Sequence, residues 1–358
     1  MSLIKSLKAS FLLSLTQDQI SNIDKDNVKK VLFLKYEKIG DMIVATPVFR
    51  ELKKALPHVK IFVLASSVNR GLLNNNPYVD KVYTYKNNWM ELFPILLQLR
   101  KYSFDVCFEF EAKVVTRAIL MLKIIKPKFV ASISKVHGRY GISADKLKIY
   151  DFYTRKNNKD HWRDICLDIL SFLKIKSKSN KYDIFLSDKE KNKAKKFVSN
   201  INSKIKIGIN LEGSFKEKQI QPEELKKICK GIYDGYSDIQ IVILTTPHKL
   251  EKTNKIISKM GFDFVIPSYV TGTILDVAAL IEQLDLIITP DTSIVHIASA
   301  FDKPIVSIYE NDKNSYRLWH PTSTLSSVVF AKDRYDSQLN YNVTDIIKYS
   351  LAIIEKHK

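Results

Sequence analysis

Residues 285–301 predict a buried strand, a sharp polar turn and a helix in direct succession. The strand is a short apolar run, and it should end at Pro290, because proline cannot donate a hydrogen bond to a sheet ladder. Helix N-cap residues come next, and a helical spacing of apolar residues then begins at Ile294. Such a turn presents backbone N–H groups at the carboxyl end of a strand, where anions bind. An ordinary capped helix is the alternative interpretation.

The same succession occurs in the other half of the chain. The apolar run at 31–34 predicts a strand, and a helical pattern follows over 43–56. Between them, Gly40 permits a close backbone approach or an unusual φ, and Asp41 comes next. One such unit in each half predicts two domains rather than one compact unit.

Apolar runs alternate with helical patterns along most of the chain. The predicted strands are 31–35, 60–64, 82–85, 105–109, 128–133, 205–210, 239–244, 263–267, 285–289 and 304–308. The helices between them include 43–56, 222–234, 274–283 and 294–301. This rhythm is typical of an α/β protein with parallel sheets covered by helices. A Lys/Ser/Asn-rich stretch at 174–188 predicts the boundary, with a lead-in at 1–28, a first domain at 29–185 and a second at 186–358.

The positive charge of the chain is concentrated in its first half. The formal net charge is +19; residues 1–185 hold 33 Lys and Arg against 17 Asp and Glu, whereas residues 186–358 carry only +3. We expect an anionic partner for the first domain, either a membrane surface or a phosphorylated glycolipid. A nucleic acid is a less favoured partner, since the sequence contains no recognisable nucleic-acid-binding motif. General solubility charge is the alternative.

The first 20 residues predict an amphipathic helix. Leu3, Ile4, Leu7, Phe11, Leu12 and Leu15 suit one helix face, with lysines at its edge. The helix could dock on the protein or lie in a membrane interface. No apolar run approaches the ~18 residues of a transmembrane helix. The three cysteines lie far apart with no metal-binding spacing, which favours buried thiols in a reducing, cytoplasmic compartment.

Three motifs occur together and in order. The first is Ile39-Gly40-Asp41 followed by Thr46-Pro47, the second is Asn76-Pro77-Tyr78-Val79-Asp80-Lys81-Val82, and the third is Asp291 to Ala300. With them the sequence resembles the lipopolysaccharide heptosyltransferase family, glycosyltransferase family 9, over roughly residues 30–325. The resemblance implies the GT-B fold, two facing Rossmann-like domains. It also implies that the first domain binds the acceptor, that the second binds the nucleotide sugar, and that the helix at 343–356 crosses back to the first domain.

The resemblance implies that Asp41 is the catalytic residue. Transfer of a sugar to a hydroxyl group requires a general base for the hydroxyl proton, and Asp41 matches the family's catalytic Asp after the same glycine. A helix N-cap is the alternative role, and one Asp can fill both.

The donor site is expected in the second half. By the resemblance, Lys218 is the cation for the diphosphate, Ser214 faces the phosphates, and Asp291 contacts sugar hydroxyls. The helix that starts at Thr292 and Ser293 offers its N-terminus, and His296 either supports the phosphate site or packs there. Lys216 is the alternate cation, and a solvated lysine-rich loop is the alternative interpretation. The chain departs from the family pattern at Ser293, where glycine is usual, and at Glu212 and Gln219.

On the acceptor side we expect a basic patch for a phosphorylated inner-core glycolipid, formed by Lys113, Arg117, Lys135 and Arg139. The function predicted from the resemblance is inverting transfer of heptose from ADP-heptose to the lipopolysaccharide inner core, at the cytoplasmic membrane surface, with no metal and no cofactor. Three alternatives stay open. The protein could use another nucleotide sugar as donor, it could be an epimerase-like nucleotide-sugar isomerase with the same GT-B fold, or it could be a basic membrane adaptor without enzyme activity.

Overall fold

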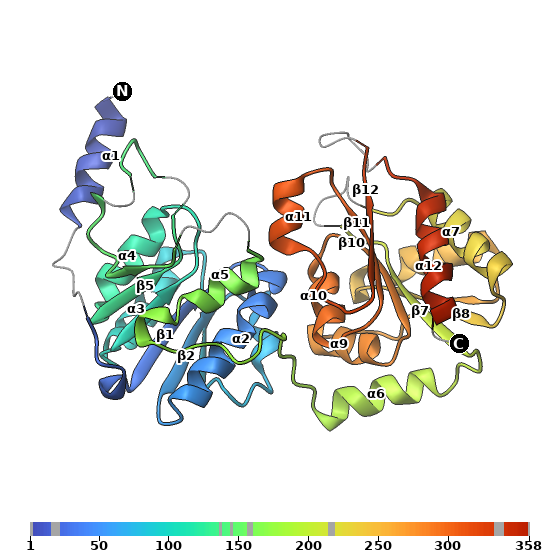
Figure 1. Cartoon of the computed structure of the whole chain (residues 1–358), viewed down its shortest axis with the longest axis horizontal. Coiled ribbons are helices and arrows are strands. Elements are labelled where there is room, and N and C mark those ends of the chain that lie inside the picture. Colours follow the sequence, from blue (N-terminus) through green and yellow to red (C-terminus); the bar gives the residue numbers. More distant parts are fainter. Residues whose placement is uncertain are drawn as a thin grey trace. The chain divides into compact units, whose positions relative to one another are not determined.

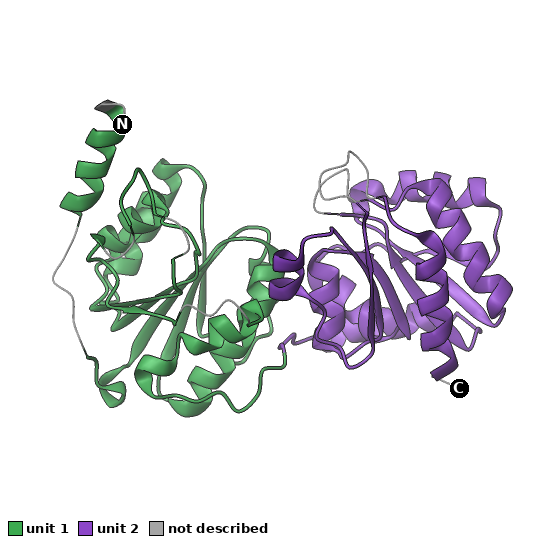
Figure 2. Cartoon of the chain, turned by 45° about the horizontal axis from the view of Figure 1, so that its top comes forward, with its two compact units in different colours: residues 1–181 green, residues 182–358 purple. Residues whose placement is uncertain are grey.

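The computed structural model describes residues 3–15, 22–135, 138–143, 146–155, 160–213, 219–332 and 340–356. The chain forms two compact units, residues 1–181 and residues 182–358 (Figure 2). The division falls inside the Lys/Ser/Asn-rich stretch at 174–188. Each unit is built around its own six-stranded sheet.

The sheet of unit 1 is parallel throughout, in the order β3-β2-β1-β4-β5-β6. Figure 1 labels β1, β2 and β5 of this sheet among the helices of the unit. Its strands are β1 (Lys30–Lys35), β2 (Lys60–Ala65), β3 (Lys81–Thr84), β4 (Val106–Glu109), β5 (Phe129–Ser132) and β6 (Phe152–Tyr153). Its helices are α1 (Leu3–Ser14), α2 (Ile39–Ala55), α3 (Trp89–Arg100), α4 (Thr116–Ile125) and α5 (Trp162–Asp168). The central strands are apolar without alternation, because helices cover both of their faces.

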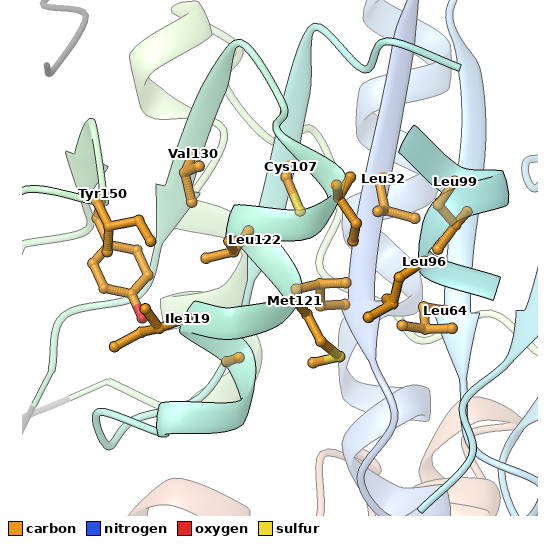
Figure 3. Packing of buried hydrophobic residues seen from close by; sticks show 14 of the residues in the cluster. Leu32, Leu64, Leu96, Leu99, Cys107, Ile119, Met121, Leu122, Val130 and Tyr150 are labelled. Carbon is orange, nitrogen blue, oxygen red and sulfur yellow. The ribbon is translucent and has the colours of Figure 1, made fainter. Parts of the chain in front are cut away.

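The alternation of side chains along β1 builds two layers of core. Leu32 points to the face covered by α3 and α4, where it shares one cluster with Leu96 and Leu122 (Figure 3). Phe33 points to the other face and meets Phe49 of α2 edge-on, with ring centroids 4.8 Å apart. Burying apolar surface on both faces fixes the register of β1 and, with it, the position of the turn that follows.

Unit 2 repeats this plan. Its sheet is parallel, in the order β12-β11-β10-β7-β8-β9. The strands are β7 (Ile205–Asn210), β8 (Ile239–Leu244), β9 (Val265–Pro267), β10 (Leu286–Pro290), β11 (Ile305–Tyr309) and β12 (Ser326–Phe330). The helices are α6 (Asp188–Val198), α7 (Pro222–Gly235), α8 (Leu250–Met260), α9 (Ile274–Glu282), α10 (Ser293–Ala300), α11 (Lys313–Trp319) and α12 (Val343–Lys356).

The C-terminal helix α12 belongs to unit 2, where it packs along α7. Gly231 and Gly235, one turn apart on α7, allow this approach, because a Cβ on either would collide with Ile347 or Leu351 of α12. The expected return of residues 343–356 to the first domain is therefore wrong: this helix covers the sheet of its own unit.

Every predicted strand is present, but the first helix begins earlier than predicted. α2 starts at Ile39 rather than at residue 43, so Gly40 and Asp41 lie inside its first turn. Gly40 is not among the described residues with positive φ, and the unusual φ considered for it is not needed. The strands β6 and β12 were not predicted: the first has only two residues, and the second begins with two serines at a sheet edge.

Candidate active site

The order of strands in each sheet defines one place where a ligand site is expected. In unit 1 the chain leaves β1 towards β2 and β3, and later returns to β4 on the other side of β1. In unit 2 the corresponding reversal lies between β7 and β10. Ligands of parallel α/β sheets bind at the carboxyl ends of the strands where the order reverses. The two motif-bearing turns, after β1 and after β10, both lie at such a position.

Asp41 is the third residue of α2 and lies just beyond the carboxyl end of β1. Its Oδ2 accepts a hydrogen bond from the backbone N–H of Lys38, the N-cap residue, over 3.3 Å. Its Oδ1 has no hydrogen-bond partner among the described residues. The carboxylate is half-buried, so one oxygen caps the helix while the other can receive a proton.

A buried ion pair lies next to Asp41. Lys35, the last residue of β1, is completely buried, and its Nζ lies 3.2 Å from Oε1 of Glu37. Burial acts to lower the pKa of Lys35, but the carboxylates of Glu37 and Asp41 outweigh it, so the pKa lies above its ordinary value. Burial raises the pKa of Glu37, with Lys35 opposing and Asp41 adding to the rise.

A second buried ion pair, between Glu109 and Lys135, lies at the carboxyl end of β4. Glu109 is bound by Lys135 and by the Ser132 hydroxyl, which donates to Oε2 over 2.8 Å. Lys135 also donates to the carbonyl oxygen of Glu111 over 2.6 Å. Burial, with the charges of Glu37 and Glu109, raises the pKa of the Glu111 carboxyl to about 7. Glu37 thus lies near both Asp41 and Glu111, at the ends of the adjacent strands β1 and β4.

In unit 2, an asparagine connects the two strands at the reversal. The side-chain amide of Asn210, at the end of β7, donates to the hydroxyl of Thr289 over 3.0 Å and to that of Thr292 over 3.3 Å. Thr292 is the N-cap of α10 and accepts from the N–H of Ile294. These contacts fix the N-terminus of α10 at the end of the sheet where β7 and β10 have their carboxyl termini. There the backbone N–H groups of α10 can bind an anion.

The other predicted residues of this turn are arranged around that helix start. Asp291 is half-exposed, and its N–H donates to Ile308 across the sheet over 2.9 Å. Ser293 is the first residue of α10 and has no positive φ, so replacing the family's glycine strains nothing. His296 is buried, with its ring edge-on to Tyr182 and Trp319, an arrangement that favours packing.

Three residues of the predicted donor site, Ser214, Lys216 and Lys218, lie outside the described residues. Glu212, just before them, forms an ion pair with Lys249. The carboxylate that stands where the family usually has proline is therefore neutralised from η6 (Pro247–Lys249).

The four predicted acceptor cations differ in their surroundings. Lys113 and Arg139 are exposed. Arg117 donates to Asn87 and lies over the rings of Tyr85 and Trp89. Lys135 is buried and paired with Glu109, so it is a weaker candidate for an acceptor contact than the exposed cations.

The described part of the chain contains no group of three or more His, Cys, Asp or Glu side chains placed to hold a metal ion. The same residues include no helix that is long and apolar enough to cross a membrane. A cavity of about 680 Å³ lies beside α5, lined among others by Arg155, Asp164 and Asp168; none of the predicted site residues lines it.

Known structures share the fold of this chain. A glycosyltransferase family 9 protein from Veillonella parvula matches with a TM-score of 0.76 and 19% identity, over 95% of this chain and 100% of the other. The ADP-heptose lipopolysaccharide heptosyltransferase II of Escherichia coli matches with a TM-score of 0.71 and 15% identity, over 92% and 99%. The expected GT-B fold, with two Rossmann-like units and parallel sheets, is confirmed.

Sequence comparison then gives the family. The model of glycosyltransferase family 9 (heptosyltransferase) matches residues 98–340. The chain belongs to this family and is a glycosyltransferase. A curated relative from Escherichia coli, "Putative lipopolysaccharide heptosyltransferase 4", is 26% identical over 331 residues, which cover 89% of this chain and 86% of the relative.

Proposed function

We propose that this glycosyltransferase moves heptose from ADP-heptose to a hydroxyl group of the lipopolysaccharide or lipooligosaccharide inner core, with inversion and without a metal. The observation that carries the proposal is the family match over residues 98–340, joined to a relative named as a heptosyltransferase that aligns over most of both chains. The ADP-heptose in the name of a structural neighbour supports the choice of donor.

The proposed reaction is a single displacement. The acceptor hydroxyl oxygen forms a bond to the anomeric carbon of the sugar while the bond from that carbon to the diphosphate oxygen breaks. The hydroxyl proton moves to Asp41, and the electron pair of the broken bond leaves with ADP. Attack from the face opposite the leaving group inverts the anomeric centre. Asp41 is half-buried and lies just beyond the carboxyl end of β1, and this position supports its role as the base.

The leaving diphosphate needs stabilising positive charge. The N-terminus of α10, held by Asn210 and Thr292, supports a role of unit 2 in binding it. We assign the cationic contact to Lys218, with Lys216 as the alternate, and contacts to the donor to Ser214, Asp291, Ser293 and His296. The acceptor is proposed to be an anionic glycolipid that contacts Lys113, Arg117, Lys135 and Arg139, of which Lys113 and Arg139 are exposed.

We further propose that unit 1 attaches to the cytoplasmic face of the membrane. Two helices support this by their large exposed apolar side chains: α1 exposes Ile4, Leu7, Phe11 and Leu13, and α3 exposes Trp89, Met90, Phe93 and Leu97. Leu12 and Ala9 of α1 pack on the protein, so the helix is attached by one face and apolar on another. Lys5 and Lys8 lie exposed on the same helix and suit anionic lipid headgroups.

The test is turnover against a panel of nucleotide sugars, with and without a delipidated inner-core acceptor. We expect ADP release from ADP-heptose only when the acceptor is present. Conversion of a nucleotide sugar in the absence of acceptor would favour the isomerase alternative, and turnover of another donor would reassign the sugar. No release of nucleoside diphosphate from any donor would refute the proposed function.

A further inference from the structure

The chain passes from unit 1 to unit 2 between Lys181 and Tyr182. The segment just before this point forms no helix or strand, yet its backbone is held in place. Arg50 of α2 donates from Nη2 to the carbonyl oxygen of Ser179 over 2.7 Å, and from Nη1 to that of Lys181 over 2.8 Å. One planar guanidinium therefore fixes the last residues of unit 1.

The neighbouring residue of α2 contributes to the same arrangement. Oε1 of Glu51 accepts from Nε of Arg50 over 2.9 Å, and its Oε2 accepts from the backbone N–H of Lys178 over 2.8 Å. Both side chains are buried, at 6% and 3% exposure. A buried ion pair is costly unless further hydrogen bonds satisfy it, and here the backbone of residues 178–181 supplies them. We call these contacts of Arg50 and Glu51 with residues 178–181 the exit clamp.

The exit clamp attaches the chain to the helix that carries Asp41. Arg50 lies on the same helix, in a stretch, 42–52, that is buried throughout. The next residue beyond the clamp, Tyr182, is buried and belongs to unit 2, where its ring lies edge-on to His296 of α10 with the ring centroids 6.0 Å apart. The chain is thus held by α2 just before it leaves unit 1, and it contacts α10 as soon as it enters unit 2.

We propose that Arg50 and Glu51 are positioning residues for the transfer reaction. They confine the joint between the two units to the step from Lys181 to Tyr182, and so connect the helix of the proposed base to the helix of the proposed diphosphate site. The inference rests on the proposed function, in which unit 1 supplies the base and unit 2 the donor. A longer, free tether lowers the effective concentration of one unit at the other, and with it the rate of transfer.

The experiment compares slack introduced on either side of the exit clamp. Two glycines inserted after Lys181 lie beyond the clamp and should widen the range of distances between the units. Two glycines inserted after Lys176, an exposed residue before the clamp, are the matched control and should leave that range unchanged. Pulsed electron resonance measures the range between spin labels at Lys101→Cys and Lys259→Cys, one exposed position in each unit; the three native cysteines are buried.

Arg50→Met tests the clamp itself and should widen the same range of distances. Its matched control is Lys53→Met, because Lys53 lies on the same helix but binds Asp80 over 2.9 Å and the carbonyl oxygen of Val59 over 2.6 Å, within the body of unit 1. This control should leave the range unchanged. If Arg50→Met does not fold, the pair of insertions decides.

Turnover gives the second readout. The insertion after Lys181 and Arg50→Met should each lower kcat roughly 10-fold, whereas Kd for ADP should not change, because no residue of unit 2 is altered. Equal ranges of distance in the two insertion variants, an unchanged range in Arg50→Met, or a wider range without loss of kcat would overturn the inference. Widening as expected in a protein that transfers no sugar would uphold the confined joint and refute the proposed function instead.

Discussion

At the scale of single residues, Asp41 is not the N-cap of α2, which is Lys38, but the third residue of the helix. Its Oδ2 caps α2 through the N–H of Lys38, and its Oδ1 has no partner among the described residues. A carboxylate fixed by its own helix has little freedom to move, which suits a group that must meet a hydroxyl proton in one geometry. Capping of the helix start by the Asp41 side chain is therefore compatible with its proposed catalytic role.

Asp41→Asn should separate these roles. The amide oxygen can still accept from Lys38, so the free energy of unfolding should change by less than about 1 kcal/mol. Because an amide is a very poor base, kcat should fall at least ~10²-fold. Thermal unfolding and a steady-state assay measure the two effects, and a rate near that of the wild type would leave Asp41 as a cap only.

Glu111 makes stability depend on pH. Its pKa in the folded protein is about 7, above the ordinary 4.5 that applies to the unfolded chain. Between these values the folded state binds more protons, so stability should fall as pH rises from about 4.5 to about 7 and then level off. With its partial solvent screening, the loss is on the order of 1–2 kcal/mol.

Glu111→Gln should remove this contribution. The variant should be more stable than the wild type at pH 8 and no more stable than the wild type at pH 4. Urea denaturation at both pH values measures it. Equal stability differences at the two pH values would show that Glu111 does not titrate in this range.

At the scale of elements, the strands were predictable because a parallel strand between two helical layers is a continuous apolar run. The order of the strands in the sheet could not be predicted, and this order determines which loops lie next to each other. Asn210 ends one predicted strand and Thr289 another, far apart in sequence, so their contact could be known only from the sheet. The burial of Lys35 and Lys135 could not be predicted from the sequence either, since lysine side chains are usually exposed.

Thr292 tests the role of the α10 start. Thr292→Ala removes the N-cap and a partner of Asn210, and should destabilise the protein by about 1 kcal/mol. If ADP binds at this helix end, its Kd should rise as well, whereas Thr292→Ser should preserve both. Calorimetric titration with ADP measures the change, and an unchanged Kd in a destabilised variant would make the cap purely structural.

At the scale of the whole molecule, charge and apolar exposure coincide in unit 1. Most of the net positive charge belongs to residues 1–185, and the exposed apolar side chains of α1 and α3 belong to the same unit. A surface that is both basic and apolar suits an anionic lipid interface, where burial and charge attraction act together.

Binding to anionic vesicles should therefore weaken steeply with salt, since exposed charges are screened over about 10 Å at 0.1 M. Deleting residues 1–20, or replacing Met90 and Phe93 by Ser, should reduce vesicle binding while transfer to a soluble, delipidated acceptor persists. Vesicle sedimentation measures this. Salt-independent binding would make the positive charge a solubility feature, and unfolding on deletion would make α1 part of the core.

The proposed activity of this chain is acceptor-dependent transfer of heptose. It is tested most directly by measuring ADP released from ADP-heptose by wild-type protein, with and without delipidated inner-core acceptor, beside Asp41→Asn. We expect release that needs the acceptor, a product of inverted anomeric configuration, and loss of both in the variant. Release that is independent of the acceptor, or equal in the variant, would contradict it.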